Sequence, residues 1–449
     1  MRNRGRIIKN IFWLLVMVIA IIALVVVYKK YNYNDFTKNI RQLNKTSFTR
    51  DSDVKYSEMD SYKIENKDYN DAMFSRVIDV TPNTIYKVTC KVKVENVQNE
   101  DNSKNAGAHI CIADTTETSQ MVSQTADWQE ITLLFNSKTR TQVQIGFRLG
   151  GYDKMSKGTV WFSDIKVEAG TPDRNNTWNM VCFIFPKIDV DVVVNGRTEH
   201  VNLEMTENDI NDVTTNMARF QNSIEQMSQG KIRINYEMIT ISEPISTLSY
   251  DEENGYYVSA SDVYEQIHTY VEEKEYDHIY VAIRMANTQM GNDTLVNDWI
   301  GLGGMDYLGI GFSNIRMPDD NNNYAYEYNY AINTFPEEVF LHEFLHTLER
   351  NSKEYGFEVP ALHDFAKYGY SDQRPDGQKK WYEDYMNKNI SYRGKKIGLP
   401  AEIFNYKPVH ESDFTYAREL DVMQEPGNMI EVIRSLFGRI GTLFSATNN

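Results

Sequence analysis

The sequence predicts a multidomain chain: a single amino-terminal transmembrane helix, then an antiparallel β-sandwich, then an α/β or α+β domain. Three observations predict this order. Residues 11–28 are uncharged and mostly apolar, residues 51–170 contain short alternating strand patterns with no helical stretch, and residues 177–440 alternate between strand and helix patterns. A chain of 449 residues is long enough for two or three domains with sizeable buried cores.

The apolar run at 11–28 lies between Lys9 and the pair Lys29–Lys30. At ~1.5 Å per residue, a helix of this length nearly spans a hydrocarbon core of ~30 Å. No small-residue cleavage site follows it, so we expect a retained anchor in 1–30 rather than a signal peptide. We expect a single-pass protein of the cell membrane, as in bacteria, with a cytoplasmic tail and an extracytoplasmic body. The polar residues 31–50 indicate a stalk.

The charge distribution excludes one class of partner. The formal net charge is −16 at pH 7, and the first 30 residues contain basic but no acidic side chains, so the body is strongly acidic. Such a body repels phosphate backbones, and we expect no nucleic-acid binding. The chain has three cysteines and no CxxC pair, which argues against a disulfide framework or a cysteine zinc site. We expect them to be buried, although Cys90 and Cys111 fall in predicted strands and could pair.

The strand patterns of 51–170 predict an antiparallel β-sandwich, because side chains alternate between apolar and polar along them. Three stretches, TPNTIYKV at 81–88, TADWQEITLLF at 125–135 and KGTVWFSDIKVE at 157–168, resemble a jelly-roll carbohydrate-binding module. The resemblance implies a glycan ligand that stacks on an exposed aromatic ring. The candidates are Trp128 and Trp161, with Tyr152 as a weaker one. The alternative is that both tryptophans belong to the core.

After a linker near 170–176 the pattern changes to that of an α/β domain. Apolar spacing predicts helices at 207–228 and 259–274, while alternating or continuous apolar runs predict strands before, between and after them. The predicted strands cover 180–194, 231–241, 276–285 and a Gly-rich segment at 301–315.

The next predicted helix carries the candidate chemistry in the run HEFLH at 342–346. Thr334 and Glu337 match a capping box and Gly356 a helix stop, which predicts a helix over 335–355. His342 and His346 are four residues apart, so both imidazoles lie on one face and can bind one Zn²⁺. Glu343 lies beside them, where a carboxylate can take a proton from a zinc-bound water that attacks a carbonyl carbon.

A third zinc ligand must come from beyond this helix. The helix continues about 13 Å past His346, so at ~3.3 Å per extended residue the chain needs four or five residues after Gly356 to return. This places the ligand near the sequence PALHD at 360–364. His363 is the first candidate and Asp364 the second. Glu349, on the same helix face as His346, is the third.

A downstream segment adds a resemblance to a known clan. LDVM at 420–423, followed by QEPGN at 424–428, predicts a tight turn carrying Met423. Together with HExxH upstream, this is similar to the methionine turn of the metzincin zinc peptidases, in which a methionine packs beneath the zinc ligands. The chain departs from the clan's longer motif, because Glu349 occupies the glycine position and Ser352 the final ligand position. The third ligand is therefore displaced.

The same resemblance implies further roles. It implies that a strand edge within 303–311 pairs with the substrate backbone, and that a tyrosine, Tyr370 or Tyr416, stabilises the oxyanion. A rival reading is a gluzincin, whose third ligand is a glutamate from a later helix. Its candidates are Glu402, Glu411 and Glu419.

Together these features predict a membrane-anchored, extracytoplasmic zinc metalloendopeptidase that acts on proteins or glycoproteins. The sandwich is expected to hold it to glycans while Glu343 serves as the general base. The alternative is a non-catalytic surface adhesin that binds glycans and keeps a degenerate peptidase scaffold. A glycosidase is weaker still, because no carboxylate pair stands out in the sequence.

Overall fold

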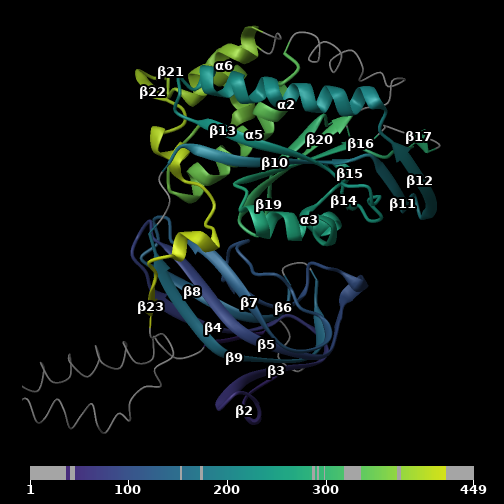
Figure 1. The fold of residues 1–449 in the computed structure, drawn as a ribbon, viewed down its shortest axis with the longest axis vertical. Helices are drawn as coiled ribbons and strands as arrows, with labels where there is room; N and C mark the ends of the chain where they lie inside the picture. Colours follow the sequence, from purple (N-terminus) through teal and green to yellow (C-terminus); the bar gives the residue numbers. More distant parts are fainter. Residues whose placement is uncertain are drawn as a thin grey trace, which may run out of the picture.

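The computed structural model describes residues 37–40, 46–151, 154–171, 175–285, 289–290, 293–297, 299–317, 335–371 and 376–420 (Figure 1). They form a β-sandwich and an α/β unit, which lie one above the other in Figure 1. None of the helices in this part of the chain is both long and apolar enough to cross a membrane. The predicted anchor at 11–28, Tyr152 and Met423 lie outside the described residues.

The predicted antiparallel β-sandwich is confirmed. One sheet has the strand order β1-β4-β8-β6, and the other has the order β2-β3-β9-β5-β7 with β23 also paired to β9. Apolar side chains that alternate along β5, such as Val88 and Val92, are buried against the facing sheet, where Ile145 and Phe147 lie. The strands are β1 (Thr37–Ile40), β2 (Thr46–Tyr56), β3 (Met59–Asn70), β4 (Ala72–Asp79), β5 (Ile85–Asn99), β6 (Gly107–Ile112), β7 (Gln124–Asn136), β8 (Gln142–Gly150), β9 (Ser156–Gly170) and β23 (Arg418–Leu420).

The sandwich extends beyond the predicted limits of 51–170 at both ends. β1 pairs with β4, and β2 begins at Thr46, so the stalk expected at 31–50 is wrong for these residues. Their polar composition is compatible with strands because β1 and β2 are edge strands of their sheets. At the other end, Arg418–Leu420 pair with β9 although they fall within the segment 177–440 assigned to the second domain.

The α/β unit is built on a twisted sheet with the order β13-β10-β16-β20-β19. The first four strands in this order pair in parallel, whereas β19 pairs with β20 in the antiparallel direction and forms an edge. The strands are β10 (Thr177–Phe185), β13 (Arg233–Thr240), β16 (His278–Arg284), β19 (Gly301–Tyr307) and β20 (Ile310–Met317).

Helices cover both faces of this sheet. Even-numbered residues of β10, from Trp178 to Ile184, pack with α2 (Glu207–Met227) and α5 (Glu338–Glu354), while odd-numbered ones pack with α3 (Ala260–Lys274). The helices α2 and α3 agree with the predicted ranges. Remaining elements are η1 (Glu100–Asn102), β11 (Lys187–Val194), β12 (Arg197–Glu204), β14 (Ser249–Asp251), β15 (Gly255–Tyr257), β17 (Gln289–Met290), β18 (Asp293–Thr294), η2 (Leu362–Tyr368), α6 (Asp376–Met386), β21 (Ile390–Tyr392), β22 (Lys395–Ile397), η3 (Ala401–Asn405) and η4 (Glu411–Phe414).

The strand predicted over 180–194 is in fact two strands. Pro186 separates β10 from β11, because proline has no N–H for a sheet hydrogen bond. β11 then leaves the main sheet and pairs with β12 as a hairpin.

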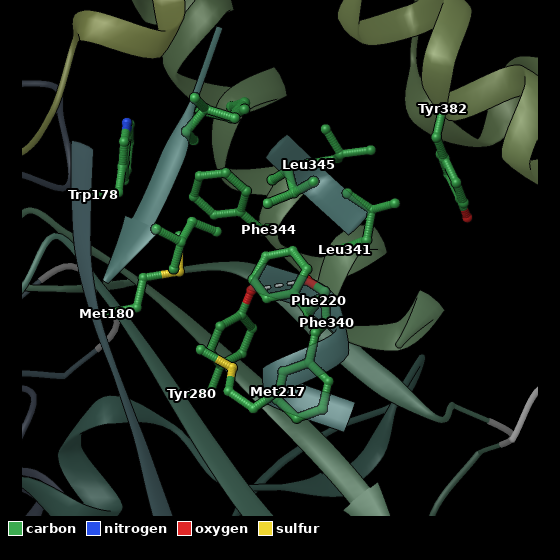
Figure 2. Close-up of a cluster of buried hydrophobic side chains, with 14 of the residues drawn as sticks. Trp178, Met180, Met217, Phe220, Tyr280, Phe340, Leu341, Phe344, Leu345 and Tyr382 are labelled. Atoms are coloured by element: carbon green, nitrogen blue, oxygen red, sulfur yellow. Dashed lines mark hydrogen bonds between the residues drawn. The ribbon is translucent and has the colours of Figure 1, made fainter. Parts of the chain in front are cut away.

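The helix α5 is held by its apolar face. Figure 2 shows Phe340, Leu341, Phe344 and Leu345 packed among α2 and β10 side chains, and all four are fully buried. The hydroxyl of Tyr280 also donates a hydrogen bond of 2.8 Å to the Phe340 carbonyl oxygen. Each such side chain contributes roughly 1.5–3 kcal/mol on burial. The packing fixes the helix about its axis, which decides where its polar face points.

The carboxyl end of α5 was predicted better from the sequence than its amino end. Glu337 is the N-cap residue, but its side chain makes no cap hydrogen bond and instead accepts one from Ser223 of α2. The helix thus begins at Glu338 rather than at the predicted residue 335, and the predicted capping box stays a prediction because Thr334 lies outside the described residues. The predicted stop is confirmed: Gly356 has φ of +79°, its N–H bonds to Lys353, and the N–H of Phe357 bonds to Ser352.

The two units contact each other through charged and aromatic residues. Lys87 of β5 pairs with Glu411 at 2.8 Å, and Lys138 of the sandwich pairs with Glu354 at the end of α5. The Tyr406 ring stacks on Tyr355, the C-cap of α5, with ring centroids 4.2 Å apart. The helix that carries the histidines is thus braced against the sandwich at its carboxyl end.

Candidate metal centre

Three histidines converge at the polar face of α5. The Nε2 atoms of His342 and His346 are 3.1 Å apart. The Nε2 atom of His363, from η2, lies 2.9 Å from that of His342 and 3.1 Å from that of His346. This is the group of potential metal ligands found among the described residues, and it contains the three histidines selected from the sequence.

The triangle of nitrogens has the dimensions of a metal site. Nitrogens this close together would allow one ion to contact all three at the usual Zn–N distance of ~2.0–2.1 Å. His363 is exposed and the other two are half-buried, so the centre faces solvent. Although His363 is partly open to solvent, desolvation of the rest of its ring and the neighbouring His346 lower its pKa, which favours the neutral imidazole that a metal requires.

The outer ring nitrogen of His342 has a partner that the sequence did not suggest. Its Nδ1 atom lies 2.9 Å from the hydroxyl oxygen of Tyr382 in α6. The Tyr382 hydroxyl donates to the buried Glu338, so its oxygen accepts from the Nδ1–H of His342. This tautomer leaves the lone pair on Nε2, directed at the centre. Tyr382 belongs to no motif and was not selected from the sequence; its place in the helix α6 is the signal that could have pointed to it.

Glu349, the third candidate for the missing ligand, lies behind His346 instead. Its Oε2 atom is 3.5 Å from His346 Nδ1 and accepts a hydrogen bond of 3.2 Å from the N–H of Leu362. Its Oε1 atom accepts one of 2.6 Å from Lys353. Although burial raises the pKa of Glu349, these hydrogen bonds from His346, Lys353 and Leu362 lower it to about 2. An ionised carboxylate here orients His346.

The other ligand candidates point elsewhere. Asp364 bonds to Lys367 at 2.8 Å, because successive residues of the η2 turn project in different directions. The glutamates of the gluzincin reading are not near the centre either: Glu411 pairs with Lys87, and Glu419 lies in β23 on the sandwich. Glu402 is exposed on η3 and outside the histidine group.

Glu343 is only 4% exposed and lies against the edge strand β19. A Cβ atom at Gly301 or Gly303 would fall on its carboxylate. Burial raises the pKa of Glu343 well above its usual range and the nearby Glu338 raises it further, while the backbone N–H of Gly303 opposes both. The structure thus places a buried carboxylate between the histidine helix and the sheet edge.

The expected substrate edge at 303–311 needs a correction. Residues up to Tyr307 belong to the edge strand β19, but Ile310 and Gly311 belong to β20, which is paired on both sides. Gly311 packs tightly against His278 and Thr347. Among the described residues, therefore, only the first half of the segment lies on an edge strand, since the turn at 308–309 reverses the chain.

The two tyrosines proposed for the oxyanion lie in different surroundings. The hydroxyl of Tyr370 donates a hydrogen bond of 2.7 Å to Asp384. Tyr416 is 95% exposed and precedes β23, which is part of the sandwich.

The tryptophans of the sandwich lie on the outer face of the sheet that contains β9 and β7, so neither belongs to the core between the sheets. Trp161 is only 5% exposed: its indole N–H donates to Asp51 at 2.9 Å, and Lys63 lies over its ring. This leaves little ring surface for a sugar. Trp128 is half-buried and meets Tyr56 edge to face, with centroids 5.8 Å apart. The three cysteines are buried and unpaired, as expected.

Comparison with known proteins finds no matching family model and no matching curated protein. Several solved structures resemble part of the chain. The enzymatically active domain of tailspike protein 4 of bacteriophage CBA120 is 13% identical over 31% of this chain and 20% of that one, with a TM-score of 0.24. TmCBM61, solved with β-1,4-galactotriose, is 10% identical to this protein. The match covers 31% of this chain and 92% of that one, with a TM-score of 0.22.

The CBM22-1 xylan-binding domain of Paenibacillus barcinonensis Xyn10C is 10% identical over 30% of this chain and 88% of that one, with a TM-score of 0.21. The matched portions are thus a minor part of this chain, and we take neither a ligand nor an activity from these neighbours.

Proposed function

We propose that this chain is a zinc-dependent metalloendopeptidase. The observation that carries the proposal is the convergence of three imidazole Nε2 atoms within 3.1 Å of one another, on a helix that also carries the buried Glu343 between two of these histidines in sequence. Hydrolysis of an amide bond needs an activated water and a group that moves its proton, and this arrangement can hold both. The order of strands and helices before α5, and the edge strand beside it, agree with the metzincin-like reading.

The roles of the residues follow from their positions. His342, His346 and His363 hold the ion, while Tyr382 and Glu349 keep the first two imidazoles in the ligating tautomer. A bound Zn²⁺ lowers the pKa of a coordinated water and polarises the carbonyl oxygen of the substrate. Glu343 takes the proton of the attacking water and delivers it to the leaving amine. The edge strand β19 is the candidate for pairing with the extended backbone of a protein or glycoprotein substrate.

We place the enzyme at the cell membrane, with its body outside, on the basis of the apolar run at 11–28 and its basic flanks. We also propose that the sandwich binds glycans through Trp128 and Tyr56, the half-buried aromatic pair on its outer face. Lys91 lies over the Tyr56 ring, as Lys63 lies over Trp161, so a sugar would stack mainly on Trp128. If the histidines hold no metal, this surface alone supports the adhesin alternative.

The test is metal content and casein hydrolysis of the purified full chain, with Glu343→Gln and a matched control. Near one zinc per chain is expected in both the wild type and Glu343→Gln, with hydrolysis lost only in the latter. Glu358→Gln alters an exposed glutamate between α5 and η2 and should retain both properties. Correctly folded protein that takes up no zinc, or a Glu343→Gln variant with wild-type hydrolysis, overturns the proposal.

A further inference from the structure

The edge strand β19 contacts α5 through glycines. Its sequence, GLGGMDY, places Gly301, Gly303 and Gly304 where the strand runs beside the helix. Strand interiors disfavour glycine, because it loses conformational freedom and offers no side chain to pack. Three glycines in four residues therefore indicate that another group approaches this backbone closely.

That group is Glu343. A Cβ atom at Gly301 would lie 2.4 Å from Oε1, 2.6 Å from Cγ and 2.7 Å from Cδ of Glu343. At Gly303 it would lie 2.7 Å from both the Oε2 atom and the carbonyl oxygen of Glu343. These separations are shorter than van der Waals contact, so no larger residue fits while Glu343 keeps its place. The two glycines form a cradle for the side chain.

A second contact fixes the strand to the same helix. The pairing of β19 with β20 shifts register between Leu302 and Met305, and Gly304 has φ of +74°. At this bulge Arg350, one turn after His346, donates to the carbonyl oxygens of Gly304 at 3.1 Å and Met305 at 2.7 Å. Arg350 therefore ties β19, which carries the cradle, to the same helix that carries His342 and His346.

We infer that Gly301 and Gly303 are positioning residues, which hold the Glu343 carboxylate in one orientation by leaving room for it against β19. A glutamate side chain has three rotatable bonds, and a general base acts only within hydrogen-bond reach of the proton it takes. The cradle removes that freedom before substrate binds. This inference rests on the proposed function, in which Glu343 is the base.

The experiment adds one methyl group at Gly301, whose nearest neighbours are all side-chain atoms of Glu343. Gly301→Ala is expected to bind Zn²⁺ like the wild type, to lose ~10–100-fold in kcat, and to keep KM nearly unchanged. Glu358→Gln is the control, because Glu358 is exposed between α5 and η2 and makes no contact with the glycines of β19. A wild-type kcat in Gly301→Ala at full zinc occupancy overturns the inference.

A thermal-stability cycle separates this inference from the proposed function, because it needs no activity. Gly301→Ala is expected to lower Tm in the wild-type background more than in a Glu343→Ala background, where the methyl group has space. If Gly301→Ala alone does not fold, recovery of folding in the double variant supports the contact. An equal loss in both backgrounds overturns it. If the wild type does not hydrolyse casein but Gly301→Ala lowers Tm more in the wild-type than in the Glu343→Ala background, the peptidase proposal is overturned and the contact between Gly301 and Glu343 is supported.

Discussion

The Oε2 atom of Glu349 accepts a hydrogen bond of 3.2 Å from the backbone N–H of Leu362, and so joins the histidine helix to the segment that returns with the third histidine. The same oxygen lies 3.5 Å from His346 Nδ1. One buried carboxylate thus contacts the ring of one candidate ligand and the residue before another, His363. Because Glu349 holds the backbone of Leu362, the chain that turns at Gly356 places the His363 imidazole at a fixed position beside the helix.

Glu349→Gln is expected to weaken zinc binding by ~10–100-fold, because removing such an outer partner frees the ligands to rotate. The neutral amide keeps the shape but loses the charge that orders His346 and Lys353. Competition against a chelator of known affinity measures the change, with the surface variant Glu358→Gln as the control. Equal zinc affinity in the two variants would show that Glu349 is only structural.

Tyr382→Phe removes one hydroxyl and keeps a ring that is 2% exposed. Without this oxygen, His342 Nδ1 loses its 2.9 Å partner, and the nearest carboxylate oxygen, on Glu338, is 3.9 Å away. We expect zinc affinity to fall about tenfold or more, and Tm to fall as well because the buried Glu338 loses a hydrogen-bond donor. Isothermal titration with Zn²⁺ measures the affinity. Tyr392→Phe, on β21, is the matched control, and an equal affinity in both would contradict the assigned role.

His109 makes the stability of the sandwich depend on pH. This fully buried side chain has an Nε2 atom that finds no hydrogen-bond partner among the described residues, and burial, with Arg148 nearby, lowers its pKa to about 3. The unfolded chain binds this proton near pH 6.5 and the folded chain does not, so stability falls as pH drops from about 6.5 toward 3. At pH 5 the loss is roughly 2 kcal/mol. Urea unfolding of His109→Leu should show a shallower dependence on pH than the wild type, and an unchanged slope would contradict this.

The ion pair of Asp71 and Arg148 is buried, with side chains 7% and 8% exposed. Two hydrogen bonds, of 2.6 and 2.7 Å, join the guanidinium to the carboxylate across the sheet. Asp71→Asn leaves a charged guanidinium poorly compensated, so we expect a loss of ~3–5 kcal/mol in the free energy of unfolding. Chemical denaturation measures it. Asp127→Asn, in the exposed pair with Lys93, should change stability little, and a similar loss in both variants would contradict the reasoning.

Much of the fold could be predicted from the sequence because its signals are local. The alternation along β5 and the apolar spacing of α2 and α3 each depend on a few neighbouring residues, and the structure agrees with them. The polar edge strands β1 and β2 gave no such signal, since half-solvated strands need few apolar residues. β23 was also missed, because its partner β9 is some 250 residues earlier in the chain.

Some features of the candidate site could also be predicted from local sequence, and others depend on contacts between distant parts of the chain. The sequence by itself determined that His342 and His346 share one helix face, since helical periodicity fixes it, and the stop at Gly356 put His363 within reach. Only the tertiary structure decided that Asp364 turns away, that Tyr382 and Glu349 hold the imidazoles, and that Gly301 and Gly303 enclose Glu343. The physical reason is range: periodicity and reach act along a few turns of chain, whereas contacts between α5, α6, η2 and β19 exist only once the core around Phe344 has packed.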